Sequence, residues 1–325
     1  MKATAIAPAN IAFIKYWGKK DERLRLPANG SISVNLSNLQ TITTVDFSAD
    51  YQEDIVIINH KKDKKEATRV VEHLNRIRHL AGIKNRAMVV SQNNFPTATG
   101  LASSASGFAA LTVAAASAAS LNLSEKELTI LARQGSGSAC RSIPDGFVEW
   151  FEGKNNETSY AHSIFPADYW SIRIITITLA YESKEVGSSL GHKLALANPF
   201  FKTRLLRINE KIKRIKRLIK EKNFRQFGEM IEREALELHA IALTSDPPII
   251  YWQPETVKII NLIRLWRKEN LSAYFTIDAG PNIFLVCEEK NLNKLIAKLN
   301  KIKEIKKIII NSPSRGTRLI SKHLF

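Results

Sequence analysis

The chain has 325 residues, 44% of them hydrophobic, which suffices for a substantial core and suggests roughly two domains or one large one. Its 48 lysines and arginines outnumber its 31 aspartates and glutamates, and the net charge of +17 suits nucleic acid, an acidic membrane surface or small anions without choosing among them. The spacing of the two cysteines matches neither a disulfide framework nor a zinc site. The sequence shows no signal-peptide pattern and no run of roughly 20 apolar residues, the length that a membrane-spanning helix needs. We therefore expect a cytoplasmic protein.

The first half of the sequence alternates extended and helical patterns. Extended patterns cover residues 4–17, 31–36 and 41–48, and helical spacing covers residues 65–81. Another strand begins at Ala87 and leads through a turn into an Ala-rich helix. A further helix is predicted over 124–134, where Ser124 and Glu127 have the spacing of a capping box. This order predicts a mixed α/β architecture.

A second strand-rich stretch begins near Tyr169. We place a domain boundary near Trp170, which gives an N-terminal domain of residues 1–170 and a C-terminal domain of residues 171–325. Helical patterns then continue to a strand at Ala273, and a helix and a short strand complete a second α/β layer.

The basic segment that begins at Lys202 is predicted to be a helix packed on the core. Its apolar residues follow the three-then-four spacing of one helix face: Leu205, Ile208, Ile212, Ile215 and Ile219. A nucleic-acid reader would interleave aromatic residues with the basic ones, and only Phe224 does so here. Nucleic-acid binding therefore ranks low.

Four short strings carry candidate chemistry, and the first is PTATGLASSA, beginning at Pro96. Gly100 and small residues lead directly into a helix, whose N-terminal N–H groups and partial positive charge suit a polyphosphate. Ser104 adds a hydroxyl for phosphate or for Mg²⁺. By itself the string fits a well-capped strand-to-helix turn equally well, and it is not a P-loop, because no lysine follows at the required spacing.

The second string is GSGSACRS, in which Ser136, Ser138 and Arg141 lie within six positions. An arginine offers a planar fork to a carboxylate or phosphate, and serine hydroxyls can satisfy the remaining acceptor oxygens. Taken alone, the string is also compatible with a loop and a structural salt bridge.

The third and fourth strings each hold one charged residue in apolar surroundings. Lys15 lies between Ile14 and an aromatic pair, where a lysine more often packs its stem and extends its amine to solvent. Asp278 ends an apolar strand before a Gly-Pro turn, which suits chemistry and capping equally.

Together, NIAFIKYWGKK, PTATGLASSA, GSGSACRS and DAGPN resemble, in this order, the motifs of the mevalonate-diphosphate decarboxylase family of the GHMP kinase superfamily. The resemblance spans most of the chain. It implies an α+β, two-domain GHMP-kinase fold, with a ribosomal-protein-S5-like N-terminal domain, a C-terminal α/β domain and the active site in the cleft between them.

The resemblance also implies a reaction in the mevalonate pathway of isoprenoid biosynthesis. ATP phosphorylates the C3 hydroxyl of mevalonate 5-diphosphate, and loss of that phosphate and of the C1 carboxylate gives isopentenyl diphosphate, ADP, phosphate and CO₂. Asp278 would act at the C3 hydroxyl, Lys15 would stabilise the same region electrostatically, and Arg141 would bind the carboxylate.

The remaining roles follow from the same resemblance. Tyr16, Lys19, Ser138 and Ser188 match positions that contact the terminal phosphates of the substrate, and Ser136 belongs to the same anion-binding string. ATP would bind at Pro96, Gly100, Leu101, Ala102, Ser103 and Ser104, and Mg²⁺ would bridge its phosphates near Ser104, held mostly by ATP and water.

One departure from the family pattern is visible after Arg141, where this chain has Pro144 and Asp145 and places a carboxylate near the anion-binding string. The alternatives are the same reaction on mevalonate 5-phosphate, a kinase that stops after C3 phosphorylation, and a non-catalytic, nucleic-acid-binding relative. Lys19 favours the diphosphate. The resemblance implies a homodimer, and we expect neither a nucleic-acid nor a membrane partner.

Overall fold

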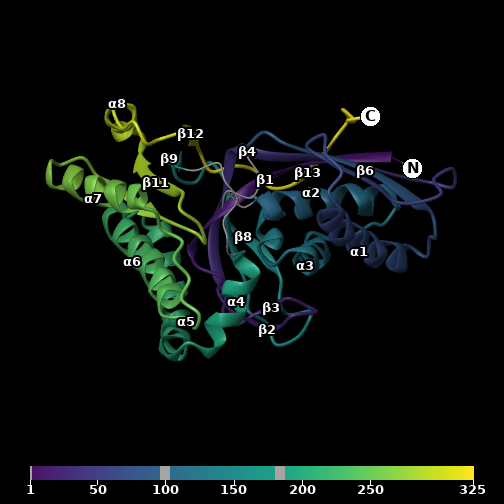
Figure 1. Cartoon of the computed structure of the whole chain (residues 1–325), viewed down its shortest axis with the longest axis horizontal. Helices are drawn as coiled ribbons and strands as arrows, with labels where there is room; N and C mark the ends of the chain where they lie inside the picture. The colour runs from purple at the N-terminus through teal and green to yellow at the C-terminus, as the bar shows by residue number, and fades with distance from the viewer. Residues whose placement is uncertain (1, 96–102, 180–186) are drawn as a thin grey trace.

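The computed structural model describes residues 2–95, 103–179 and 187–325. Two sheets carry the fold (Figure 1). The first has the order β13-β1-β4-β6-β5, with β7 on β4 and β8 on β7. Its strands are β1 (Lys2–Ile14), β4 (Ser31–Ser48), β5 (Ile55–Ile58), β6 (Arg86–Asn93), β7 (Phe147–Trp150), β8 (Ala161–Phe165) and β13 (Arg318–Ile320). A small ribbon pairs β2 (Lys19–Asp21) with β3 (Leu26–Pro27).

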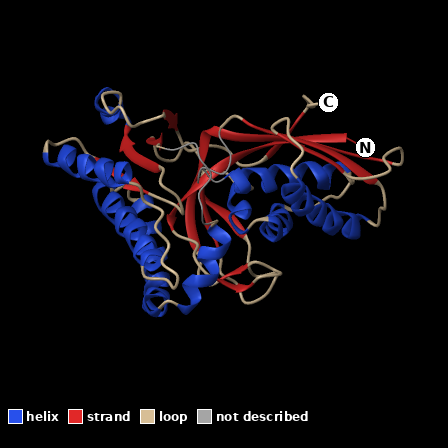
Figure 2. Ribbon diagram, in the orientation of Figure 1, coloured by secondary structure: helices blue, strands red, loops and turns tan. Residues whose placement is uncertain are grey.

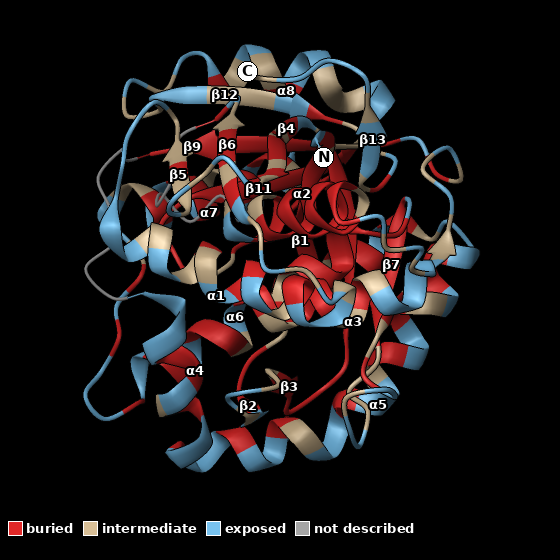
Figure 3. Cartoon of the chain, turned by 90° about the vertical axis from the view of Figure 1, so that its right-hand side faces the viewer, coloured by how far each residue is buried: buried red, intermediate tan, exposed pale blue. Residues whose placement is uncertain are grey.

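Helices α1 (Lys64–Ala81), α2 (Ser103–Ala118) and α3 (Glu125–Gly135) pack together on the first sheet (Figure 2). Most of α2 is buried, as its central position in Figure 3 shows, because alanine and serine side chains let it approach the strands closely. Helix α3 begins with the predicted capping box of Ser124 and Glu127. The predicted helix over 65–81 is likewise present as α1.

The second sheet is antiparallel, with the order β10-β11-β9-β12. Its strands are β9 (Ile172–Thr178), β10 (Ala273–Thr276), β11 (Ile283–Glu288) and β12 (Lys307–Asn311). The accompanying helices are α4 (Ser188–Ala197), α5 (Pro199–Lys220), α6 (Phe224–Leu243), α7 (Pro254–Lys268) and α8 (Leu292–Leu299), with short 3₁₀ helices η1 (Gly137–Ser142) and η2 (Glu289–Asn291). Ile208, Ile212, Ile215 and Ile219 of α5 are buried, as their spacing predicts.

One hydrophobic cluster contains residues from both halves of the chain. Strands β1 and β4 extend beyond the α1–α3 layer, so that Phe13 and Ile32 pack in one cluster with Ile215, Ile231 and Phe284 of the second half. Phe13 meets Phe227 edge to face at 4.9 Å between ring centroids. The end of β1 is therefore held by apolar packing from both halves.

Two details differ from the sequence-based expectations. The extended patterns over 31–36 and 41–48 form one strand, β4, whose pairing with β1 is interrupted by irregularities rather than by a turn. The strand before Asp278 ends at Thr276, two residues early, so the carboxylate lies in the following loop. Within the described residues, no helix is long and apolar enough to cross a membrane.

The C-terminal segment leaves the second sheet and returns to the first. β13 pairs antiparallel with β1, and the backbone N–H of Gly316 donates to Asp145 Oδ1 at 2.6 Å. The Thr317 hydroxyl donates to the Ser142 carbonyl at 2.7 Å. Asp145 therefore secures this returning segment, which accounts for a carboxylate close to the anion-binding string.

Candidate active site

The centre of the site is an ion pair between the two halves of the chain. Lys15 follows β1, Asp278 follows β10, and Lys15 Nζ lies 2.6 Å from Asp278 Oδ1. The Lys15 side chain is 1% exposed and that of Asp278 is 27% exposed. The Lys15 amine also donates to the Ala12 carbonyl at 2.8 Å. The common arrangement of a lysine whose amine reaches solvent does not apply here.

Burial lowers the pKa of Lys15 from its usual value, although the neighbouring carboxylates of Asp278 and Glu234 oppose that shift. The ammonium thus depends on nearby anions to stay charged. A buried cation whose partner carboxylate is partly exposed can interact with charge that develops on a bound substrate.

Arg141, in η1, is a buried cation bound only by neutral groups. Its guanidinium donates to Asn10 Oδ1 at 3.1 and 3.2 Å and to Ser31 Oγ at 3.0 Å. Among the described residues it has no salt bridge, so the structural salt bridge considered from the sequence is absent there. Three of the five N–H groups of a guanidinium are engaged, which leaves two for an anion. The side chain is fixed in place before any ligand binds.

Tyr16 lies close enough to Arg141 to interact with it electrostatically. Tyr16 packs against Trp150 and His192, with ring centroids 4.6 and 4.3 Å apart, respectively. Its buried hydroxyl has no hydrogen-bond partner among the described residues, and burial raises the pKa of Tyr16, so it remains a neutral donor. Any side chain at Gly137 would clash with the Tyr16 ring, because a Cβ there would lie 2.7 Å from its hydroxyl.

Lys19 and Ser188, both predicted to contact phosphates, are placed differently from each other. Lys19 is buried along its stem, and its amine lies 2.7 Å from Glu22 Oε2. Ser188 is exposed at the first residue of α4, one turn before His192, whose Nδ1 accepts the Gly18 N–H at 3.0 Å. Helix α4 thus brings Ser188 to the segment that carries Tyr16 and Lys19.

The described part of the predicted phosphate cradle is the N-terminus of α2. Ser104 is exposed, and its hydroxyl lies 3.3 Å from that of Ser136, which links the first and second strings. The first turn of α2 contains no acidic residue that would repel a phosphate. Ser103 begins this helix, and Ser138 lies in η1, where its carbonyl accepts from Asn10 at 3.1 Å. The predicted ATP contacts Pro96, Gly100, Leu101 and Ala102 lie outside the described residues.

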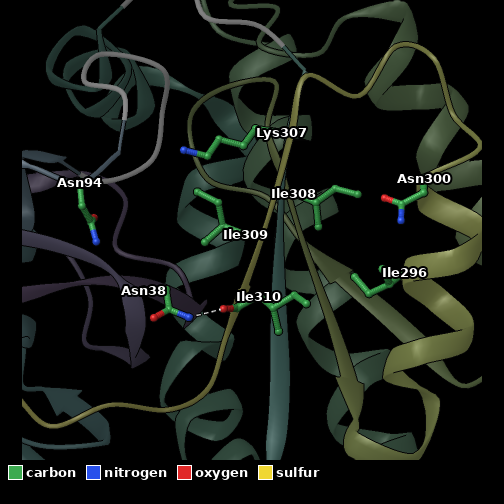
Figure 4. Close-up of a pocket in the computed structure, with 8 residues that line it drawn as sticks. All are labelled: Asn38, Asn94, Ile296, Asn300, Lys307, Ile308, Ile309 and Ile310. Atoms are coloured by element: carbon green, nitrogen blue, oxygen red, sulfur yellow. Dashed lines mark hydrogen bonds between the residues drawn. The ribbon is translucent and has the colours of Figure 1, made fainter.

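An open groove of about 560 Å³ lies elsewhere, between α8, β12 and the first sheet (Figure 4). It is lined by Asn38, Asn94, Ile296, Asn300, Lys307, Ile308, Ile309 and Ile310. None of the predicted site residues lines it, and its isoleucines do not suit a phosphorylated substrate. The chemistry points instead to the pair of Lys15 and Asp278.

Known proteins resemble this chain over both of its halves. Residues 7–161 match the family model of the diphosphomevalonate decarboxylase-like N-terminal domain, and residues 174–319 match that of the mevalonate 5-diphosphate decarboxylase C-terminal domain. The chain is 37% identical to diphosphomevalonate decarboxylase of Candida albicans over 92% of this chain and 88% of that one. It belongs to the diphosphomevalonate decarboxylase family.

Solved structures of the family superpose on the whole chain. The mevalonate diphosphate decarboxylase of Staphylococcus aureus has a TM-score of 0.94 at 39% identity and covers 98% of both chains. The structure of MDDEF in complex with MVAPP, AMPPCP and magnesium has a TM-score of 0.92 at 40% identity, covering 98% of this chain and 99% of that one. These findings confirm the predicted family, the two-domain α+β fold and the ATP-dependent diphosphomevalonate decarboxylase activity.

Several residues of this family member's site were missed from the sequence. Asn10 and Ser31 bind Arg141, and Glu234 accepts the Lys15 N–H at 3.1 Å. Asn10 sits in an almost wholly apolar strand, and Glu234 occupies the apolar face of α6, three residues after Ile231. Both Asn10 and Glu234 are polar residues at positions that the sequence periodicity assigns to the core. That mismatch could have identified them as candidate site residues from the sequence.

Proposed function

We propose that the chain converts mevalonate 5-diphosphate, with ATP, into isopentenyl diphosphate, ADP, phosphate and CO₂. The observation that carries the proposal is a buried Lys15–Asp278 ion pair with Arg141 close enough to interact electrostatically with both. Arg141 is a buried cation that only neutral groups bind among the described residues. The family relationship and the MVAPP complex of the related MDDEF support it.

In this proposal Asp278 accepts the proton of the C3 hydroxyl as that oxygen attacks the γ-phosphate of ATP. The partly exposed carboxylate can reach a substrate, and Lys15 holds it in position through the 2.6 Å contact. Phosphoryl transfer passes through a loose transition state with dispersed negative charge, so positioning and cationic stabilisation supply most of the catalysis. The ammonium of Lys15 provides that positive charge.

The second step breaks two bonds of the phosphorylated substrate. The C3–O bond breaks as phosphate departs, and the electrons of the C1–C2 bond form the new C2=C3 double bond as CO₂ leaves. Arg141 binds the C1 carboxylate until this point, with the two N–H groups that Asn10 and Ser31 leave available.

The phosphate groups are assigned to the residues around this centre. Tyr16, Lys19, Ser136, Ser138 and Ser188 bind the diphosphate of the substrate, and Ser103 and Ser104 contribute to ATP binding together with Pro96, Gly100, Leu101 and Ala102. Mg²⁺, when bound, neutralises charge on the ATP phosphates. Ser104 is the candidate protein ligand, because its hydroxyl is exposed on a turn without acidic residues.

The proposal also covers the domain division, the oligomeric state and the location of the protein. The division into domains 1–170 and 171–325, a homodimeric assembly and a cytoplasmic location are each expected from the sequence pattern or from the family resemblance.

The test measures ADP and CO₂ release by purified protein with ATP and Mg²⁺, offering mevalonate 5-diphosphate and mevalonate 5-phosphate in parallel. Stoichiometric release of both products from the diphosphate alone is the expected result. Release only from the monophosphate would change the substrate. ADP without CO₂ would mean a kinase that stops at the 3-phosphate, and no ADP from either substrate would refute the proposal.

A further inference from the structure

Four buried or half-buried ions on α5 and α6 form a group that we name the α5–α6 ion cluster: Arg204, Lys211, Glu234 and Glu237. Two of them hold the backbone of Lys15. Glu234 Oε1 accepts the Lys15 N–H at 3.1 Å, and the Arg204 guanidinium donates to the Lys15 carbonyl at 3.0 Å. Both backbone groups of the central lysine are therefore bound by one buried ion pair.

Arg204 and Glu234 are more deeply buried than their cluster partners. Their side chains are each 1% exposed, against 23% for Lys211 and 35% for Glu237. Two cations and two carboxylates already balance within the cluster, so the contact of Glu234 with Lys15 is not required for neutrality. Glu237 shares the same partners but makes no hydrogen bond to Lys15.

Charged and titratable groups face Lys15 from four elements: Asp278 after β10, Arg141 in η1, Arg204 on α5, and Glu234 and His239 on α6. Of the described residues that act electrostatically on Lys15, only Asp278 and Glu234 are anions. Burial alone would raise the pKa of Glu234, but Arg204 and Lys211 outweigh it and hold that pKa at about 2. Burial lowers the pKa of His239 to about 3, so this ring is neutral. Once Asp278 takes up a proton, Glu234, whose carboxylate contacts the Lys15 N–H, is the anion that remains beside Lys15 in the part of the chain that the structure describes.

We propose that Glu234 is a positioning residue that fixes the Lys15 backbone and serves as the second counter-ion of its ammonium while Asp278 carries the substrate proton. This inference rests on the roles proposed above for Lys15 and Asp278. A cluster that only ties the two halves together would affect stability without altering the protonation of Lys15.

The experiment uses the paired substitution Glu234→Gln with Lys211→Gln in the full chain. Removing one partner of a buried ion pair leaves an uncompensated charge, whereas this pair removes one charge of each sign and retains Arg204 with Glu237. The glutamine oxygen can still accept the Lys15 N–H. Glu237→Gln with Lys211→Gln is the matched control, because it alters the same cluster without changing Glu234 or Arg204, the two members that contact Lys15.

The decisive readout is the alkaline limb of the kcat/KM–pH profile, measured with thermal midpoint and ATP-analogue binding as folding controls. Lys15 acts as a cation, so activity is lost as pH rises through its pKa, and removing a nearby anion lowers that pKa. We expect the limb to move about one pH unit to lower pH and kcat at neutral pH to fall about tenfold, with the control unchanged. An unmoved limb in the folded variant, or an equal shift in the control, would overturn the inference.

Two further variants keep the outcomes distinguishable. Glu234→Asp retains the charge but is too short for the observed contact, so we expect a lower kcat with the limb in place, and this variant decides the question if the paired one does not fold. A limb displaced in Glu234→Asp as far as in the glutamine variant would contradict the charge role. Lys15→Arg should remove the limb altogether, and a limb that persists there would refute the role of Lys15 itself.

Discussion

The proposed catalytic centre and the proposed phosphate-binding periphery of the site are built in opposite ways. At the centre, Lys15 and Arg141 are almost fully buried, and each side chain is fixed by hydrogen bonds to the surrounding strands and loops. At the periphery, Ser104 and Ser188 are exposed, and the Lys19 amine is engaged by Glu22.

This difference separates two energetic strategies. Fixed, buried charges need little rearrangement when negative charge develops on the substrate, which is where electrostatic catalysis gains most. In the proposed mechanism the Lys19 amine must leave the Glu22 carboxylate before it binds the diphosphate, at some cost in affinity. Substitutions at the centre should therefore affect kcat, and substitutions at the periphery should affect KM.

The largest effect is expected for Asp278→Ala. It removes the group proposed to accept the hydroxyl proton and leaves Lys15 without its 2.6 Å partner, so turnover should fall by about 10³-fold or more. ATP-analogue binding should persist, because α2 and its serines are untouched. Steady-state ADP release and nucleotide titration measure the two quantities.

Asp278→Asn is the matched control for shape. It retains the size of the side chain and an oxygen toward Lys15 but cannot take up the proton. Turnover close to that of the parent chain in either variant would remove Asp278 from its assigned role.

A smaller but still large loss is expected for Arg141→Lys. The lysine keeps the charge but cannot reproduce the contacts to Asn10 and Ser31 while also gripping a carboxylate with two N–H groups. Charge-assisted hydrogen bonds contribute about 1.5–3 kcal/mol each, so kcat/KM should fall about 100-fold. Arg173→Lys is the control: Arg173 is a half-buried arginine of β9 that forms an ion pair with Glu289. Equal losses of kcat/KM in the two variants would contradict a specific role for Arg141.

The sequence predicted those features that depend on residues close together in the chain or on a known family pattern. Local rules correctly placed the capping box at Ser124 and the apolar face of α5, because each depends on residues three or four positions apart. The resemblance to a known family located Lys15, Arg141 and Asp278, which the structure brings together from distant parts of the chain.

What the sequence could not show are contacts that exist only in the folded chain. Glu234 meets Lys15 across 219 positions, and Asn10 meets Arg141 across 131. Asp145 stood next to the anion-binding string in sequence, yet its partner is Gly316 near the end of the chain. The three pairs depend, respectively, on the docking of α6, on the packing of η1 against β1 and on the return of the C-terminal segment to the first sheet, none of which short-range periodicity encodes.

The smallest effect is expected at the periphery, for Lys19→Met. Methionine retains most of the buried stem but removes the amine, so KM for the diphosphate substrate should rise about tenfold, equivalent to about 1.4 kcal/mol, while kcat changes little. Glu22→Gln provides the opposite change, because it releases the Lys19 amine from its 2.7 Å ion pair. It should leave KM unchanged or lower it. If Lys19→Met reduced kcat instead of raising KM, Lys19 would act like the fixed, buried charges of the centre. The proposed difference between the centre and the periphery would then not hold for Lys19.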